Sequence, residues 1–196
     1  MALIQPASVP GERLDEPRAA AVALRLAELM GVYRRPPDAR LDRQLLEELA
    51  GAVAGSGIAD RLALPAEGAR ARRRLALAVL EALEASPLPA AEIERLAAML
   101  GLDRLATMAG ASVPSLRRYA RGERTTPDPV AQRIHFLARI VAVLRGSFNE
   151  FGVRRWFERA RTALDGRAPA DLLAGTWDPD DADPQRVREL AESLLA

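Results

Sequence analysis

The chain has 196 residues, of which 49% are hydrophobic, so it is long enough to bury a sizeable core in one or two domains. Its formal net charge is only +1, and the absence of cysteine excludes disulfides and thiol chemistry. The two longest apolar stretches, 19–30 and 75–83, are interrupted by Arg or Glu, so neither predicts a membrane span. Residues 1–17 lack a basic region followed by an apolar core, so we expect no secretion signal and a cytoplasmic protein.

Helical periodicity dominates the sequence, and no segment alternates polar and apolar residues as a half-buried strand would, so we expect an all-α fold. In the first 86 residues the pattern predicts three helices, over 17–30, 38–53 and 67–85. Gly31 is expected to end the first helix, and Asp38 to cap the second. Residues 1–86 therefore form an N-terminal helical region, and its role is left open.

A domain boundary is predicted at 86–89, where two prolines separated by one residue cannot continue a helix. The next unit, 87–147, begins with a helix over 90–100 and ends with a long helix over 130–145. The apolar stripe of that long helix has helical spacing, with Val130, Ile134, Leu137, Val141 and Leu144. A C-terminal domain, 148–196, follows.

Between these two helices, residues 102–122 (LDRLATMAGASVPSLRRYARG) carry the spacing of a helix-turn-helix. Small Ala106 falls where the two helices would cross, and Gly110 follows to turn the chain. Ser112 can cap the second helix with its hydroxyl. The pattern therefore predicts that residues 87–147 form a DNA-binding domain.

The second helix of this motif has an inward face and an outward face. Val113, Leu116 and Tyr119 share the apolar face and are expected to pack inward. The outward face carries the candidate DNA-binding residues Ser112, Pro114, Ser115, Arg117, Arg118 and Arg121. Guanidinium groups reach guanine edges and phosphates, so the expected partner is double-stranded operator DNA, bound by a homodimer. The alternative is an ordinary helical hairpin with a solvated basic face.

The charge distribution favours DNA binding, because the basic residues are concentrated in one part of the chain. Residues 103–145 hold eight arginines against three acidic residues, whereas residues 176–196 hold six acidic residues against two arginines. A local basic surface within a nearly neutral protein is typical of a small duplex-binding module.

Aromatic side chains gather after Gly146, at Phe148, Phe151, Trp156, Phe157 and Trp177. The spacing of Phe151, Trp156 and Phe157 predicts one buried helical face. Trp177 lies in an acidic, proline-rich segment, so we expect it to be exposed and to anchor a partner protein.

The sequence lacks the usual signatures of an enzyme. It has no glycine-rich phosphate loop, no paired histidines and no nucleophile elbow, so we predict no catalytic residues and no cofactor. The single histidine, His135, follows Ile134 of the apolar stripe and is expected to be a packed or partly exposed structural residue and not a catalytic one. The acidic run 178–183 lacks the glycine and the distal glutamate of a calcium loop, so no metal site is predicted.

The order of segments after residue 90 resembles antitoxins of the Xre/MbcA/ParS type. The similar segments are QRIHFLARI at 132–140, GVRRWF at 152–157 and LDGRAPADLL at 164–173. Their most specific residues are Arg133, Leu137, Ile140, Trp156, Leu164, Gly166, Pro169 and Leu172. The resemblance covers about residues 90–196 and implies an all-α dimer, with an Xre-like DNA-binding half followed by a small toxin-binding domain.

The resemblance further implies a protein that represses its own operon and neutralises a partner toxin, usually a RES-domain enzyme that destroys NAD. In the family, the C-terminal end of the antitoxin reaches into the active-site cleft of the toxin. Carried onto this chain, the toxin-binding residues are Ser193, Leu194, Leu195 and Ala196, with Trp177 as a further contact.

Two alternatives stay open at this point. A stand-alone helix-turn-helix regulator, or a DNA-organising protein without a toxin partner, would have the same DNA-binding half. In addition, Leu190, Leu194 and Leu195 could pack the final helix onto its own domain instead of contacting a toxin.

Overall fold

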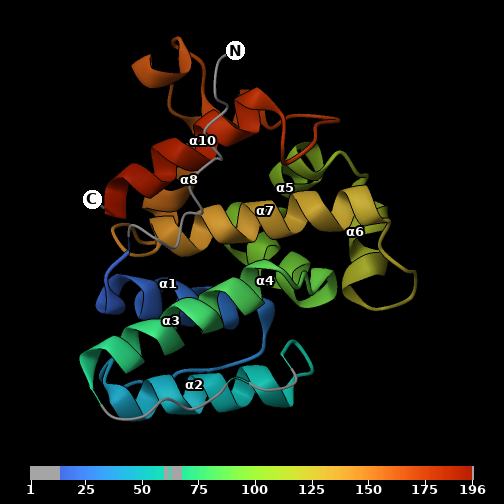
Figure 1. Cartoon of the computed structure of the whole chain (residues 1–196). Coiled ribbons are helices and arrows are strands. Elements are labelled where there is room, and N and C mark those ends of the chain that lie inside the picture. The colour runs from blue at the N-terminus through green and yellow to red at the C-terminus, as the bar shows by residue number, and fades with distance from the viewer. Residues whose placement is uncertain (1–13, 60–61, 63–67, 196) are drawn as a thin grey trace, which may run out of the picture.

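The computed structural model describes residues 14–59, 62 and 68–195, and this part of the chain is all-α, as predicted (Figure 1). The first helices are α1 (Glu16–Met30), α2 (Arg43–Gly55), α3 (Ala69–Glu84) and α4 (Pro89–Leu100). They are followed by α5 (Leu102–Ala109), α6 (Val113–Ala120), α7 (Asp128–Leu144) and α8 (Glu150–Glu158). The last elements are η2 (Thr162–Leu164), α9 (Pro169–Leu172), α10 (Ala182–Glu192) and η3 (Ser193–Leu195). None of the helices in the described ranges is long and apolar enough to cross a membrane.

Helix α7 is the central element of the fold. Figure 1 shows α7 crossing the middle of the molecule, with α1 and α3 on one side and α10 on the other. The predicted apolar stripe is buried from Ile134 to Leu144, and Val130 is partly buried. One hydrophobic cluster extends from Leu14 to Ala191, so the N-terminal helices pack on the same core as the rest of the described chain.

The N-terminal helices agree with the sequence pattern except at the start of α2. Gly31 ends α1 with a φ of 74°, as predicted. The prediction that Asp38 caps the second helix is wrong, because α2 begins at Arg43 and the Asp42 carboxylate accepts a hydrogen bond from the Leu45 amide at 3.0 Å. Asp38 lies instead in a turn in which the Ala39 amide donates to the Pro36 carbonyl.

A buried polar pair joins α4 to α7. The Glu92 side chain is fully buried, and His135 is only 6% exposed. The Nδ1 atom of His135 lies 2.6 Å from Oε1 of Glu92, and its Nε2 lies 2.9 Å from the carbonyl oxygen of Glu84. Because a carbonyl can only accept, Nε2 is the donor to Glu84, while Nδ1 makes the contact with the Glu92 carboxyl group. His135 is therefore a packed residue, as predicted, and it ties α4 and α7 to the end of α3.

Candidate nucleic-acid interface and C-terminal end

Helices α5 and α6 are short and are joined by a tight turn at 110–112. Gly110 ends α5 with a φ of 64°, a left-handed conformation that favours glycine. Ser112 then caps α6, because its Oγ accepts a hydrogen bond from the Ser115 amide at 3.3 Å. The roles that the sequence predicts for these two residues are confirmed.

The inward face of α6 is well packed. Leu116 is fully buried and Tyr119 is 5% exposed, while Val113 is partly buried against the core. Across the turn, Ala106 of α5 is also buried, and α6 contacts α4 as well as α5. Figure 1 places α6 at the edge of the molecule, so its outer side faces away from the central helix.

The candidate DNA-binding residues lie on that outer side. Five of the six are exposed, namely Ser112, Pro114, Arg117, Arg118 and Arg121, and Ser115 is half-buried. The Ser112 hydroxyl donates to Oγ of Ser115 at 2.9 Å, so both hydroxyls take part in the helix cap. The arginines therefore supply most of the binding chemistry of this face.

A fourth arginine, which the sequence analysis missed, extends the basic surface. The guanidinium carbon of Arg124 lies 5.9 Å from the centre of the Tyr119 ring, and the residue is exposed. We call Arg117, Arg118, Arg121 and Arg124 the basic face of α6. Arg121 lies 3.5 Å from Glu123, whereas Arg117 and Arg118 form no ion pair with the described residues. In the sequence, the run Arg-Gly-Glu-Arg at 121–124 could have indicated that the basic surface continues to Arg124.

The prediction that Trp177 is exposed is wrong. Its side chain is only 7% exposed, and its ring lies edge-on to Phe136 with the centroids 5.3 Å apart. The indole Nε1 donates to the carbonyl oxygens of Met108 at 2.8 Å and Leu173 at 2.9 Å. Trp177 is therefore part of the core in this conformation and cannot serve as an exposed anchor.

The segment around Trp177 supplies hydrogen-bond donors to the carbonyls at the C-terminal end of α5, where a helix runs out of its own donors. The Thr107 carbonyl accepts from the Gly175 amide at 3.0 Å, and the Met108 carbonyl accepts from Trp177. Buried Arg133 completes the set, because its Nη1 donates to the Ala109 carbonyl at 3.3 Å while its Nε donates to the Trp177 carbonyl at 2.5 Å. We call residues 173–178 the capping segment, since it holds the turn that leads into α6.

The aromatic residues of α8 only partly follow the sequence prediction. Trp156 and Phe157 are buried, as predicted, and their rings lie edge-on at 5.2 Å. The prediction that Phe151 is buried is wrong, because its side chain is 64% exposed, with Arg155 5.9 Å above the ring. Asn149 caps α8 through the Gly152 amide, and this start places Phe151 in the first turn on the outer side.

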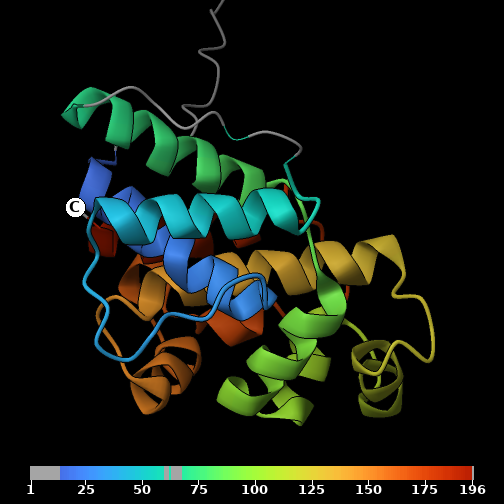
Figure 2. The same cartoon turned by 90° about the horizontal axis from the view of Figure 1, so that it is seen from below.

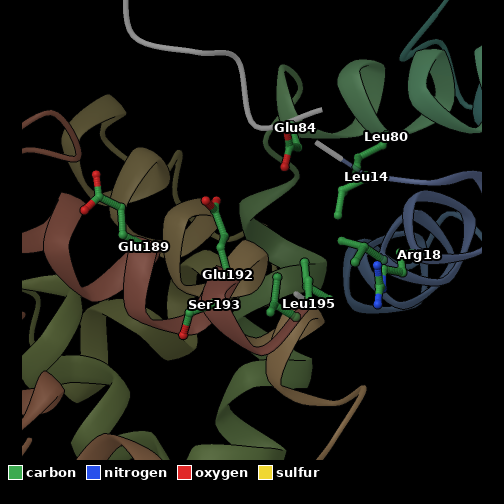
Figure 3. Close-up of a pocket in the computed structure, with 10 residues that line it drawn as sticks. Leu14, Arg18, Leu80, Glu84, Glu189, Glu192, Ser193 and Leu195 are labelled. Carbon is green, nitrogen blue, oxygen red and sulfur yellow. The ribbon is translucent and has the colours of Figure 1, made fainter. Parts of the chain in front are cut away.

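The C-terminal end of the described chain is partly packed. Ser193 and Leu194 are exposed, the latter by 40%, whereas Leu190 and Leu195 contact the core. The predicted toxin contact Ala196 lies outside the described residues. Figure 3 shows Glu192 and Leu195 beside a pocket of about 320 Å³, which Leu14 and Leu80 of the N-terminal region also line.

The acidic run after Trp177 is engaged in local hydrogen bonds. Asp181 accepts from the Asp178 amide at 2.8 Å, and Asp178 accepts from the Asp180 amide at 2.9 Å. Within the part of the chain that the structure describes, no group of three or more His, Cys, Asp or Glu residues could hold a metal ion.

Comparisons with protein-family models, with curated proteins and with solved structures find no match to this chain. A functional argument therefore depends on the residues themselves.

Proposed function

We propose that this protein binds double-stranded DNA through the basic face of α6. The observation that carries the proposal is the division of this helix into two sides. Leu116 and Tyr119 are buried on one side, and Arg117 and Arg118 project from the other without an acidic partner among the described residues. Such a helix, at the edge of the molecule, has the size and charge to enter a major groove about 12 Å wide.

The proposed contact has two parts. Ser112, Pro114 and Ser115 at the start of α6 approach the base edges, and the arginines of the second half contact guanine edges or phosphates. One such helix reads only a few base pairs, so we propose a homodimer that binds two half-sites about one helical turn apart. The binding would be strongly salt-dependent, because neutralised phosphates release counterions.

The test is the double substitution Arg117→Ala/Arg118→Ala, with DNA from immediately upstream of the protein's own gene in a mobility-shift assay. Because each guanidinium contact contributes to binding, affinity should fall by about tenfold or more, and the slope of log affinity against log salt should decrease by about 1–2. The matched control is Arg70→Ala/Arg74→Ala, two exposed arginines of α3. Wild-type affinity in the α6 variant, with an unchanged circular-dichroism spectrum, would overturn the proposal.

We further propose that DNA binding serves a toxin–antitoxin system, in which the C-terminal end contacts a RES-domain, NAD-degrading toxin. Two observations favour this role over a stand-alone regulator. The segments between 132 and 173 resemble Xre/MbcA/ParS-type antitoxins, and Leu194 leaves an apolar side chain 40% exposed next to the chain end. Leu195 contacts the core, so insertion of the whole end into a toxin would require η3, which lines the pocket in Figure 3, to move away from the core.

Co-expression with a RES-domain toxin encoded beside the gene would test this second proposal. Leu194→Asp should abolish protection without lowering the melting temperature, since the side chain is exposed. Deletion of residues 192–196 should also abolish protection and leave operator binding intact. If Leu194→Asp still neutralises the toxin, the toxin contact that the family resemblance implies is wrong. If the truncated protein unfolds, the C-terminal end belongs to the core.

A further inference from the structure

Two adjoining cavities lie between α1, the loop that follows it, α4 and the end of α7. Their volumes are about 460 Å³ and about 290 Å³, and they share Glu28, Arg35 and Arg145. Figure 2, seen from below, shows α1, its following loop and α4 together in this region. The two cavities form one concave surface, which we call the arginine pocket because it is lined by Arg25, Arg34, Arg35, Arg95 and Arg145.

The positive charge of the arginine pocket is poorly compensated. Its lining includes two carboxylates, Glu28 and Glu150, against five guanidinium groups, which leaves a local charge of +3. Arg145 lies 3.4 Å from Glu28. The other four arginines form no ion pair with the described residues.

Arg25 shows the electrostatic cost of this arrangement. Burial lowers the pKa of its guanidinium, Arg145 and Arg35 lower it further, and Glu28 opposes them. Its Nε donates to the Ala142 carbonyl at 2.5 Å, which holds the group at the end of α7. A Cβ at Gly146 would lie 3.0 Å from its Nη2, so the absence of a side chain there leaves room for the guanidinium. A bound anion would offset the repulsion among these groups.

The lining also indicates what kind of anion fits. Guanidinium groups match phosphate oxygens with paired hydrogen bonds, and a +3 surface complements more than one phosphate. The larger cavity is also lined by the half-buried ring of Tyr33, which offers contact for an organic group. Both volumes are close to or within the range of small-molecule sites, about 300–1,000 Å³. We propose that the arginine pocket binds a small molecule of nucleotide size that carries two or more phosphate groups.

Titration calorimetry with ADP and with inorganic pyrophosphate would test the proposal on the full-length protein. The variant is Arg34→Glu/Arg35→Glu, two exposed residues of the loop after α1, chosen because their replacement leaves the core intact. Its affinity for both probes should fall by about tenfold or more, since hydrogen bonds to charged groups are lost. Arg70→Glu/Arg74→Glu makes the same charge change on α3, outside the pocket, and should bind like wild type.

Three results would overturn the proposal. The first is that neither probe binds the wild-type protein at millimolar concentration. The second is that the α3 control loses as much affinity as the loop variant, which would indicate only general attraction to a basic protein. The third is that the loop variant weakens binding to a non-specific DNA duplex that pyrophosphate does not displace, which would assign these arginines to the DNA backbone. Retained ADP binding in Arg117→Ala/Arg118→Ala would separate this site from the proposed DNA contact.

Discussion

The α5–α6 region and the capping segment lie against each other, yet the sequence pattern describes the first far better than the second. In α6 the apolar residues Leu116 and Tyr119 are buried and Arg117 and Arg118 are exposed, as helical spacing predicts. In the capping segment the acidic, proline-rich composition placed Trp177 in solvent, whereas it is buried.

The difference arises from where each residue finds its packing partner. Helical periodicity assigns a whole face at once, so several residues of α6 support the same assignment. Trp177 stands alone in a loop, and its indole hydrogen bond reaches Met108, 69 residues earlier in the chain. The acidic composition of this segment reflects the residues next to Trp177 in the sequence, and it carries no information about the contacts of the Trp177 side chain itself.

The largest expected effect comes from removing the buried ring. Trp177→Ala should lower the free energy of unfolding by about 3–5 kcal/mol, because it leaves a cavity and an unpaired Met108 carbonyl. Urea unfolding followed by circular dichroism measures the change. Phe151→Ala is the matched control, and it should stay within about 0.5 kcal/mol of wild type because that ring is exposed. Similar losses in the two variants would contradict the comparison between buried and exposed aromatics.

A smaller effect is expected where the two regions approach most closely. A Cβ at Gly110 would lie 2.4 Å from the Gly175 carbonyl oxygen, and φ is already in the left-handed region. Gly110→Ala should therefore cost about 2–3 kcal/mol, from backbone strain and displacement of the capping segment.

Gly122→Ala isolates the backbone contribution to that loss. Gly122 has a φ of 69°, and a Cβ added there would meet no other atom within 4 Å, so its replacement should cost only about 1 kcal/mol. Equal costs at both glycines, in the same unfolding measurement, would show that the contact between α5 and the capping segment contributes nothing.

The smallest expected effect concerns the C-terminal end. Burial raises the pKa of the Glu192 carboxyl above 4.5, Glu84 and Glu189 act in the same direction, and Arg188 and Arg139 oppose the shift. As pH rises above 4.5, the unfolded chain loses this proton first, so the contribution of Glu192 to stability falls until the folded pKa is passed. Glu192→Gln should therefore raise the melting temperature by about 1–2 °C at pH 7.

The same variant should have a melting temperature close to that of the wild-type protein at pH 4, where the carboxyl group is mostly protonated in the unfolded chain and more so in the folded one. Calorimetric scans at the two pH values measure the difference. A stabilisation that is larger at pH 4 than at pH 7 would reverse the sign and show that Arg188 and Arg139 outweigh burial.

The sequence by itself determined the all-α class, most helix ends and the division of α6 into two faces. These features depend on interactions within a few residues, such as the left-handed Gly31 and the Ser112 cap. The same local rules failed at Asp38, since a second aspartate, Asp42, was equally suited to capping and lay closer to the buried leucines of α2. When two residues are equally good capping candidates in the sequence, only the packing of the helix decides which of them becomes the cap.

Only the tertiary structure decided the burial of Trp177, the exposure of Phe151 and the Glu92–His135 pair. It also gathered the arginine pocket, whose residues come from α1, the loop after it, α4 and the end of α7. The sequence shows these arginines as scattered positions among many. Their convergence depends on how whole helices pack around α7, because that packing minimises the free energy of the entire core rather than of any one segment.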